Sequence, residues 1–241
     1  MPRVPRVHQC QYGAYYHLMN RGHNREVLLR SDDDFAYFLN LLDRYQGRFG
    51  QHLYHYCLMN NHFHLLADCP DPGALSKWMA GLLRSYVHYY NRRYGFVGHL
   101  WQGRFKSPVV GVEEYFLSCA RYLERNPVRA GVVAEPWAYA WSSCRAYALG
   151  EENPLLSYNV WYRGLAATAD ERQARWREFL LGDDPHEEEI RRGDWIEGDA
   201  AKRRRMQQEG PRPGRRHGRP RQAPPGQDGL FPEFYGATKD A

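Results

Sequence analysis

The sequence contains no run of 18 apolar residues, which excludes a membrane-spanning helix of ordinary length. Its first residues, MPRVPRVHQCQYG, carry positive charges but no apolar stretch, so a secretory signal is not expected. Cysteine is scarce as well: the five cysteines are scattered, odd in number and without a C-x-x-C pair. This pattern favours reduced thiols in the cytoplasm over a disulfide framework.

Acidic residues are few in two parts of the chain. Residues 77–129 contain nine Lys or Arg against three Asp or Glu, a local charge of +6, and residues 202–221 contain nine against one, or +8. Residues 130–201 between them have seven against fourteen, or −7. Basic segments in a chain with 15% aromatic residues indicate a polyanionic partner, most often nucleic acid. For residues 202–221, a solvated extension without a partner is the alternative.

Hydrophobic periodicity and turn residues predict the elements. They are a strand over 11–20, a helix after the SDDD cap at 31–34, strands over 52–58 and 62–69, a helix over about 73–93, an extended segment over 98–111, a helix over about 112–125, and a later helix capped by TADE at 168–171. This order is typical of an α+β fold, with a mostly antiparallel sheet and helices packed on one face.

The composition predicts three regions. One domain spans residues 1–150, a helical C-terminal extension spans 151–206, and a Pro/Arg/Gly-rich disordered tail spans 207–241.

Two histidines open the strand predicted at 62–69, in the stretch NNHFHLLA. Because alternate strand residues share a face, His62 and His64 point the same way, with Phe63 on the other side. One interpretation is two polar residues on a half-exposed strand. The other is a pair of neutral imidazole ligands for a divalent cation.

The helix predicted at 112–125 presents polar side chains at helical spacing. Tyr115, Cys119, Tyr122 and Asn126 form one stripe along it. A tyrosine oxygen beside a bound cation is a potential nucleophile toward phosphorus, since free tyrosine has a pKa near 10 and needs activation. The alternatives are core packing for Tyr115 and a helix stop for Asn126, which precedes a proline.

Four motifs, MNNHFHLL, WQGRFKS, RYLERNPVRAGVV and YAWSSCRAY, occur in the order and spacing of a known family. Together they resemble the single-tyrosine HUH transposases of the IS200-like type, and in particular the REP-associated tyrosine transposases, over about residues 8–150. The resemblance implies a ferredoxin- or RRM-like fold. It implies a transposase that nicks and joins single-stranded DNA at hairpin-forming REP-like repeats, through a 5′-phosphotyrosine link.

The family's functional residues map onto this chain by motif. His62 and His64 match the ligands of Mg²⁺ or Mn²⁺, and Tyr122 matches the nucleophile. Asn126 stands where relatives commonly have a glutamine that completes the metal site. The family includes both monomers and homodimers. One further departure is Met-Asn-Asn before the histidines, where relatives usually have Met-Pro-Asn.

Basic and aromatic residues around these motifs are candidates for DNA contacts. They are Arg21, Trp101, Arg104, Lys106, Arg121, Arg125 and Arg129. Trp101 is expected either to stack on a base or to pack in the core.

Two other functions fit parts of the sequence. One is a catalytically idle repeat-DNA-binding protein derived from a transposase, which intact His62, His64 and Tyr122 disfavour. The other is a zinc protein that uses His52, His55, Cys57, His62 and His64. The spacing of that set matches no usual zinc motif.

Overall fold

The computed structural model describes residues 13–68, 70–110, 113–187 and 190 of the 241-residue chain. The elements are, in chain order, β1 (Tyr15–Arg21), the 3-10 helix η2 (His23–Arg25), α1 (Asp32–Phe49), β2 (Leu53–Met59), β3 (His62–Asp68), α2 (Pro72–Tyr94), β4 (Val109–Val110), α3 (Glu113–Glu124), α4 (Asn126–Arg129), the 3-10 helix η3 (Pro136–Ala138), α5 (Cys144–Leu149), α6 (Val160–Arg163) and α7 (Ala169–Leu181). Within the described ranges, no helix is both long and apolar enough to cross a membrane.

The strands form one sheet in the order β2-β3-β1-β4, and every neighbouring pair is antiparallel. β1 and β3 pair along their full lengths, with Met19 opposite His64 and Arg21 opposite His62. At the free edge of β2, the backbone N–H of Leu58 donates to the carbonyl of Trp141. Along β1, Lys106 and Met19 exchange two backbone hydrogen bonds. The predicted α+β class with an antiparallel sheet is confirmed.

The predicted helix boundaries follow from local chemistry. Ser31 and Asp34 form a reciprocal capping box at the start of α1, and Gly50 ends the helix with a φ of 64°. The Asp71 side chain accepts a hydrogen bond from the backbone N–H of Gly73 at the start of α2. The TADE motif caps α7 through Thr168 in the same way as Ser31 caps α1.

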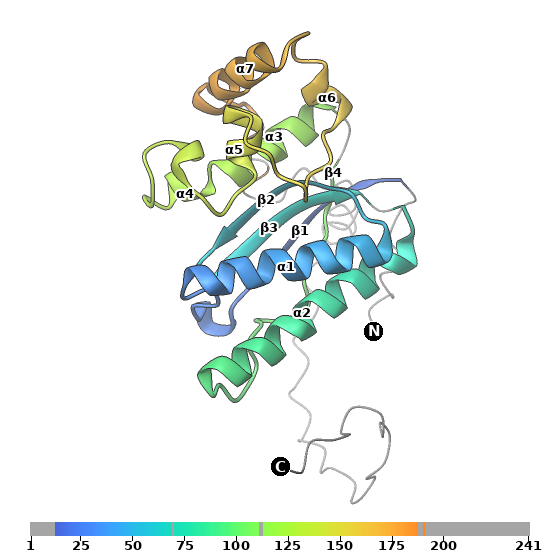
Figure 1. The fold of residues 1–241 in the computed structure, drawn as a ribbon, viewed down its shortest axis with the longest axis vertical. Coiled ribbons are helices and arrows are strands. Elements are labelled where there is room, and N and C mark those ends of the chain that lie inside the picture. Colours follow the sequence, from blue (N-terminus) through green and yellow to red (C-terminus); the bar gives the residue numbers. More distant parts are fainter. Residues whose placement is uncertain (1–12, 69, 111–112, 188–189, 191–241) are drawn as a thin grey trace, which may run out of the picture.

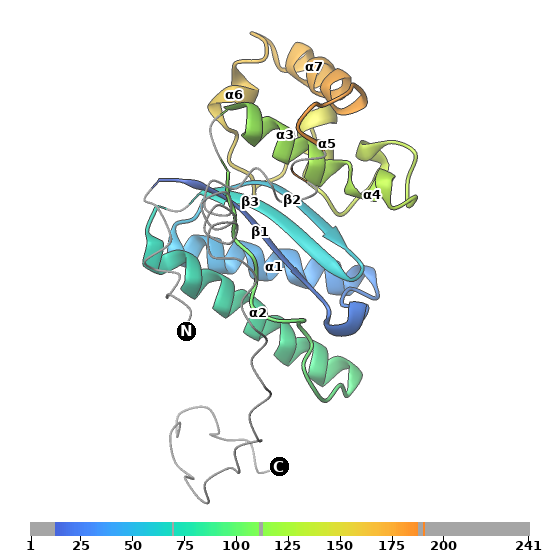
Figure 2. The same ribbon diagram turned by 180° about the vertical axis from the view of Figure 1, so that it is seen from behind.

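The helices cover both faces of the sheet, and this corrects the expectation of helices on one face. Figures 1 and 2 show α1 and α2 on one side and α3 with the later helices on the other. The physical reason is that β2 and β3 are buried at nearly every position, so both faces require apolar cover. One core cluster lies under α1 and α2, and a second lies between the sheet and α3, α5 and α7.

The helix stop predicted at Asn126-Pro127 is confirmed, and a second short helix begins at the same place. α3 ends at Glu124, and a second short helix, α4, begins at Asn126. Proline is tolerated there because the first turn of a helix does not use its backbone N–H groups. The break between α3 and α4 leaves Tyr122 in the last turn of α3 and Asn126 at the start of α4, where its side chain hydrogen-bonds His62.

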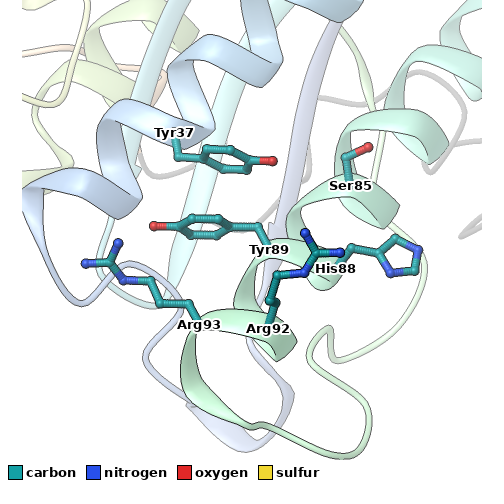
Figure 3. Close-up of a pocket in the computed structure, with 6 residues that line it drawn as sticks. All are labelled: Tyr37, Ser85, His88, Tyr89, Arg92 and Arg93. Carbon is teal, nitrogen blue, oxygen red and sulfur yellow. The ribbon is translucent and has the colours of Figure 1, made fainter. Parts of the chain in front are cut away.

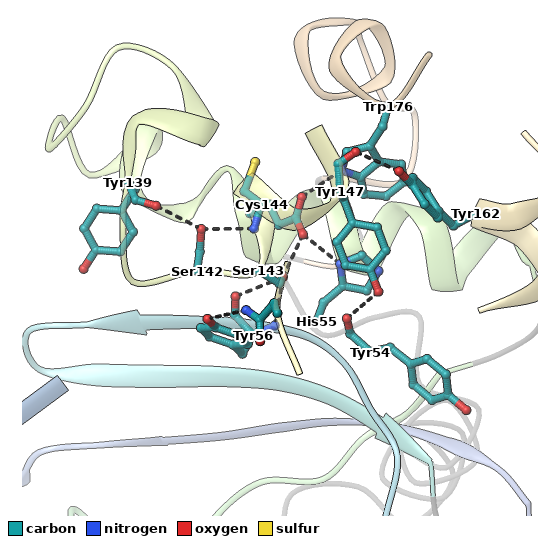
Figure 4. A network of polar contacts seen from close by, with 12 residues as sticks. Tyr54, His55, Tyr56, Tyr139, Ser142, Ser143, Cys144, Tyr147, Tyr162 and Trp176 are labelled. Atoms are coloured by element: carbon teal, nitrogen blue, oxygen red, sulfur yellow. Dashed lines mark hydrogen bonds and ion pairs between the residues drawn. The ribbon is translucent and has the colours of Figure 1, made fainter. Parts of the chain in front are cut away.

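A buried carboxylate fixes α3 to the rest of the molecule. Glu124 is fully buried, and its Oε1 lies 2.8 Å from both the Nδ1 of His55 in β2 and the Oγ of Ser143. Its Oε2 accepts a hydrogen bond of 2.9 Å from the indole N–H of Trp176 in α7. Figure 4 shows His55, Ser143 and Trp176 gathered around this carboxylate. We call these four residues the Glu124 cluster.

The Glu124 cluster bears on the predicted regions of the chain. Trp176 lies beyond the predicted boundary at residue 150, yet it packs in the same core as α3. The division into a domain over 1–150 and an extension over 151–206 stays a prediction. The predicted tail over 207–241 lies outside the described residues.

Candidate active site

His62 and His64 lie in β3 on the face of the sheet that α3 covers. Residues directly opposite each other in an antiparallel pair share a face, so Met19 and Arg21 of β1 lie on this face as well. His17, two residues before Met19, also belongs to it. Its ring centroid lies 5.0 Å from that of His64, and the centroids of His62 and His64 are also 5.0 Å apart.

Each of the two predicted ligands has its Nδ1 atom engaged. The Nδ1 of His62 lies 2.7 Å from Oδ1 of Asn61, which only accepts, so His62 donates. The Nδ1 of His64 lies 2.8 Å from the Nε2 of His17. An imidazole with its proton on Nδ1, as the contact of His62 with Asn61 requires, can offer a lone pair only from Nε2; for His64 this depends on the direction of its hydrogen bond with His17.

Burial keeps these imidazoles neutral. Desolvation lowers the pKa of His17 to about 3. Desolvation, together with the positive charges that His17, His62 and Arg129 would carry, holds the pKa of His64 well below 6.5. For His62, burial lowers the pKa, and a hydrogen bond with the Asn126 side chain partly opposes this effect. Neutral imidazole is the form that binds metal ions.

α3 brings Tyr122 to the histidines. Its ring centroid lies 5.9 Å from that of His64 and 6.2 Å from that of His17, in edge-on contacts. The guanidinium of Arg129 lies over the same ring, 3.9 Å from its centroid, and also donates to the backbone carbonyl of Tyr122. Tyr115 lies elsewhere, with its ring 4.8 Å from that of His186. Among the two tyrosines of the predicted stripe, Tyr122 contacts the histidines.

Three of the predicted DNA contacts surround this cluster. Arg21 is exposed and lies opposite His62. Lys106 is exposed and bridges Met19, so it lies on the histidine face at the edge of the sheet. Arg129 lies over Tyr122. Arg104 is exposed in the same segment as Lys106, and the half-buried Arg125 donates to the carbonyl of Gly182.

Two predicted contacts have other surroundings. The Arg121 side chain is 1% exposed and binds Glu187 and the carbonyls of Phe179 and Gly182, so it joins α3 to the segment after α7. It is not accessible to a phosphate in this fold. Trp101 packs against Phe63 on the opposite face, and its indole N–H donates to the carbonyl of Leu83. This arrangement favours core packing, the alternative stated for Trp101.

The donor set fits a cation that is held by few protein ligands. His62 and His64 supply two imidazoles, and Asn126 stands beside His62 as a source of an amide oxygen. Among the residues that the structure describes, no group of three or more His, Cys, Asp or Glu side chains is arranged to hold a metal. Two imidazoles and an amide oxygen leave room for water and phosphate, an arrangement that suits Mg²⁺ or Mn²⁺ better than a closed zinc site.

Two histidines of the zinc hypothesis have carboxylate partners instead of a shared metal site. His52 pairs with Asp68, and His55 pairs with Glu124. Cys57 is fully buried, and this raises the pKa of its thiol and keeps it protonated. The thiolate is the form that binds zinc, so this set is disfavoured.

A cavity of about 450 Å³ lies on the other side of the sheet, in the layer of α1 and α2. Figure 3 shows its lining: Tyr37 from α1, and Ser85, His88, Tyr89, Arg92 and Arg93 from α2. None of the predicted ligands or nucleophiles is among these residues. The candidate active site is therefore the histidine face and not this cavity.

His17 is a residue of the candidate site that the sequence analysis missed. The alternation in YYHLMNR places it on the same face as Arg21, and that signal was available. What the sequence does not give is the pairing of β1 with β3, which sets His17 diagonally across from His64.

The fold and this site are similar to those of transposase-type proteins. Residues 10–126 match the family described as IS200-like transposases, so this part of the chain is similar to that family. The match ends at Asn126, so it includes both histidines and Tyr122.

One solved structure supports the fold. The structure of a REP-associated tyrosine transposase bound to a REP hairpin is 16% identical with a TM-score of 0.52, covering 66% of this chain and 93% of that one. A candidate transposase from Deinococcus radiodurans R1 is 17% identical and covers 55% of this chain and 92% of that one, but its TM-score of 0.35 carries no argument. No curated protein matches the chain.

Proposed function

We propose that this protein is a metal-dependent tyrosine transposase that cleaves and rejoins single-stranded DNA beside a hairpin. The observation that carries the proposal is the contact of Tyr122 with His64, within a chain segment that matches the IS200-like transposase family. A phenol beside two neutral imidazoles, each with its Nδ1 engaged by a neighbouring side chain, suits such a reaction.

His62 and His64, with Asn126, would hold Mg²⁺ or Mn²⁺. When bound, the cation would polarise a phosphate oxygen and lower the pKa of a neighbouring hydroxyl. The other parts of the reaction belong to side chains of the chain itself.

In the cleavage step, the Oη of Tyr122 loses its proton to solvent and forms a bond to phosphorus. The bond from phosphorus to the 3′ oxygen breaks, and that oxygen takes a proton to give a free 3′-OH. The DNA stays attached through a 5′-phosphotyrosine. Attack by a 3′-OH on this phosphorus reverses the step, so a joined strand forms without an external energy source.

Arg129 has two functions in this scheme. Its guanidinium over the Tyr122 ring restricts the ring, and its positive charge would lie next to the phosphate that Tyr122 attacks. Arg21, Arg104 and Lys106 would contact phosphates on either side, since all three are exposed near the histidine face or its edge.

The substrate we propose is single-stranded DNA next to a hairpin of the REP type, because the solved relative carries such a hairpin. The protein would act as a monomer or a homodimer. Cys57, Cys119 and Cys144 are free and buried, in keeping with a reducing cytoplasm.

The test is removal of one hydroxyl at a time. Tyr122→Phe should bind hairpin DNA like the wild type but form no covalent protein–DNA adduct on a denaturing gel. Tyr115→Phe is the matched control, because it lies on the same helix but packs against His186, and it should still form the adduct. An adduct in Tyr122→Phe would show that another group attacks, and no adduct in any form of the protein would favour the idle DNA-binding alternative.

A further inference from the structure

His17 is a buried residue that the reaction scheme does not use. It is 1% exposed, it lies on the histidine face of β1, and its ring contacts both His64 and Tyr122. Its Nε2 lies 2.8 Å from the Nδ1 of His64. A separation of this size is that of a hydrogen bond, which needs a proton on one nitrogen and a lone pair on the other.

The direction of this hydrogen bond matters for a ligand. For His64 to offer a lone pair from Nε2, its single proton must reside on Nδ1. The Nδ1–H of His64 then donates to His17, and the Nε2 of His17 accepts. With the bond in the other direction, the Nε2 of His64 would carry the proton and could not bind a cation.

We propose that His17 is a positioning residue: it holds His64 in the tautomer and orientation that present Nε2 to the divalent cation. The inference rests on the proposed function, since it concerns the same cation. His17 itself does not bind the cation in this proposal. It lies in β1, whereas the proposed ligands His62 and His64 lie in β3.

The strand register explains why a histidine is suited to this position. His17 pairs with Leu66, two residues beyond His64, so the two histidines are diagonal neighbours. Diagonal positions are about 7–8 Å apart, a separation that two imidazole rings can bridge and that serine or alanine cannot. His62 reaches the same state by another route, through the amide oxygen of Asn61.

A purely structural role for His17 makes a different prediction. If the ring only filled space in the core, phenylalanine would replace it well, and glutamine would replace it poorly. If His17 accepts the Nδ1–H of His64, the order is reversed, because the amide oxygen of glutamine can accept near the place of Nε2 and phenylalanine cannot.

The experiment measures Mn²⁺ binding to the full-length protein by titration calorimetry. His17→Phe should weaken Mn²⁺ binding by about 10- to 100-fold, the usual effect of losing a partner of a metal-ligating histidine. His17→Gln should recover most of the affinity. Leu18→Val is the matched control: Leu18 is fully buried in the same strand but faces α1 and α2, so it should lower the melting temperature and leave the Kd for Mn²⁺ unchanged.

The outcomes separate this inference from the proposed function. Unchanged Mn²⁺ affinity in His17→Phe would overturn the positioning role alone, whereas a wild type that binds no Mn²⁺ would overturn both. If neither His17 variant folds, ¹H–¹⁵N spectra of the histidine rings in the metal-free wild type decide the question. A proton on the Nδ1 of His64 supports the role, and a proton on its Nε2 refutes it.

Discussion

Two groups of residues that contain histidine lie on the same face of the sheet, and their surroundings differ. His55 belongs to the Glu124 cluster, where a fully buried carboxylate accepts from three different donors. His62 has the side-chain amides of Asn61 and Asn126 as partners, His64 has the imidazole of His17, and Tyr122 beside them is half-buried. The first group is closed around a shared carboxylate, whereas the second has neutral partners.

We infer from the comparison that the partner of an imidazole decides its role. A buried carboxylate binds the Nδ1 of His55 and fixes three segments of the chain to one point. Neutral partners at Nδ1 orient His62 and His64, and in the proposed function Nε2 then binds the cation. α3 serves both groups, since it carries Glu124 for the first and Tyr122 for the second. The closed group thus holds the helix on which the proposed nucleophile depends.

The largest effect should follow from opening the Glu124 cluster. Glu124→Ala leaves the buried donors of His55, Ser143 and Trp176 without their acceptor. Breaking a buried network of this kind costs about 3–5 kcal/mol of unfolding free energy. Chemical denaturation should show the loss as a lower midpoint.

His62→Ala is the matched variant from the other group. His62 is half-buried near the mouth of the site, so its unfolding free energy should change by about 1 kcal/mol or less. Its DNA cleavage should nevertheless be lost while hairpin binding remains. Equal destabilisation by the two substitutions would mean that the division into a structural and a functional group is wrong.

The sequence was sufficient to group most residues of the candidate site because the proposed ligands and nucleophile lie in short motifs. His62 and His64 are two residues apart, and Tyr122 and Asn126 are four apart, so strand and helix periodicity alone group them. The Glu124 cluster could not be predicted in this way, since Trp176 follows Glu124 by 52 positions and the pairing depends on how α7 packs. Arg121 was misjudged for the same reason: its partners, among them Glu187, come from the segment after α7.

A smaller effect should distinguish the two sides of the sheet by their contact with DNA. Lys106 lies at the edge of the histidine face, whereas the equally exposed Arg84 lies on α2, across the sheet. Lys106→Gln should make the plot of log K against log salt shallower by about 0.7, the value for one phosphate contact with a single strand. Arg84→Gln should leave the slope unchanged. Fluorescence anisotropy with hairpin DNA measures both, and a change only in Arg84→Gln would place the DNA on α2.

The smallest effect concerns Glu187, a carboxylate that is less buried than Glu124. It pairs with Arg121 and, at 2.9 Å, with Arg129, the residue over Tyr122. Although burial raises the pKa of Glu187, hydrogen bonds from Arg121 and Arg129 outweigh this effect and hold the pKa below its ordinary value. A carboxyl with a lowered folded-state pKa stabilises the protein above its unfolded-state pKa, near 4.3. That stabilisation is lost as the pH falls through the lower folded-state pKa.

Glu187→Gln should therefore reduce the unfolding free energy at pH 7 by about 1 kcal/mol at most, as is usual for partly exposed pairs. The difference from the wild type should shrink as the pH falls from 5 to about 3, because Glu187 of the wild type is then protonated as well. Denaturant titrations of both proteins across this range test the sign. A difference that grows in acid would mean that Glu187 does not stabilise the protein as a carboxylate, and that Arg129 is held over Tyr122 by the ring and its carbonyl alone.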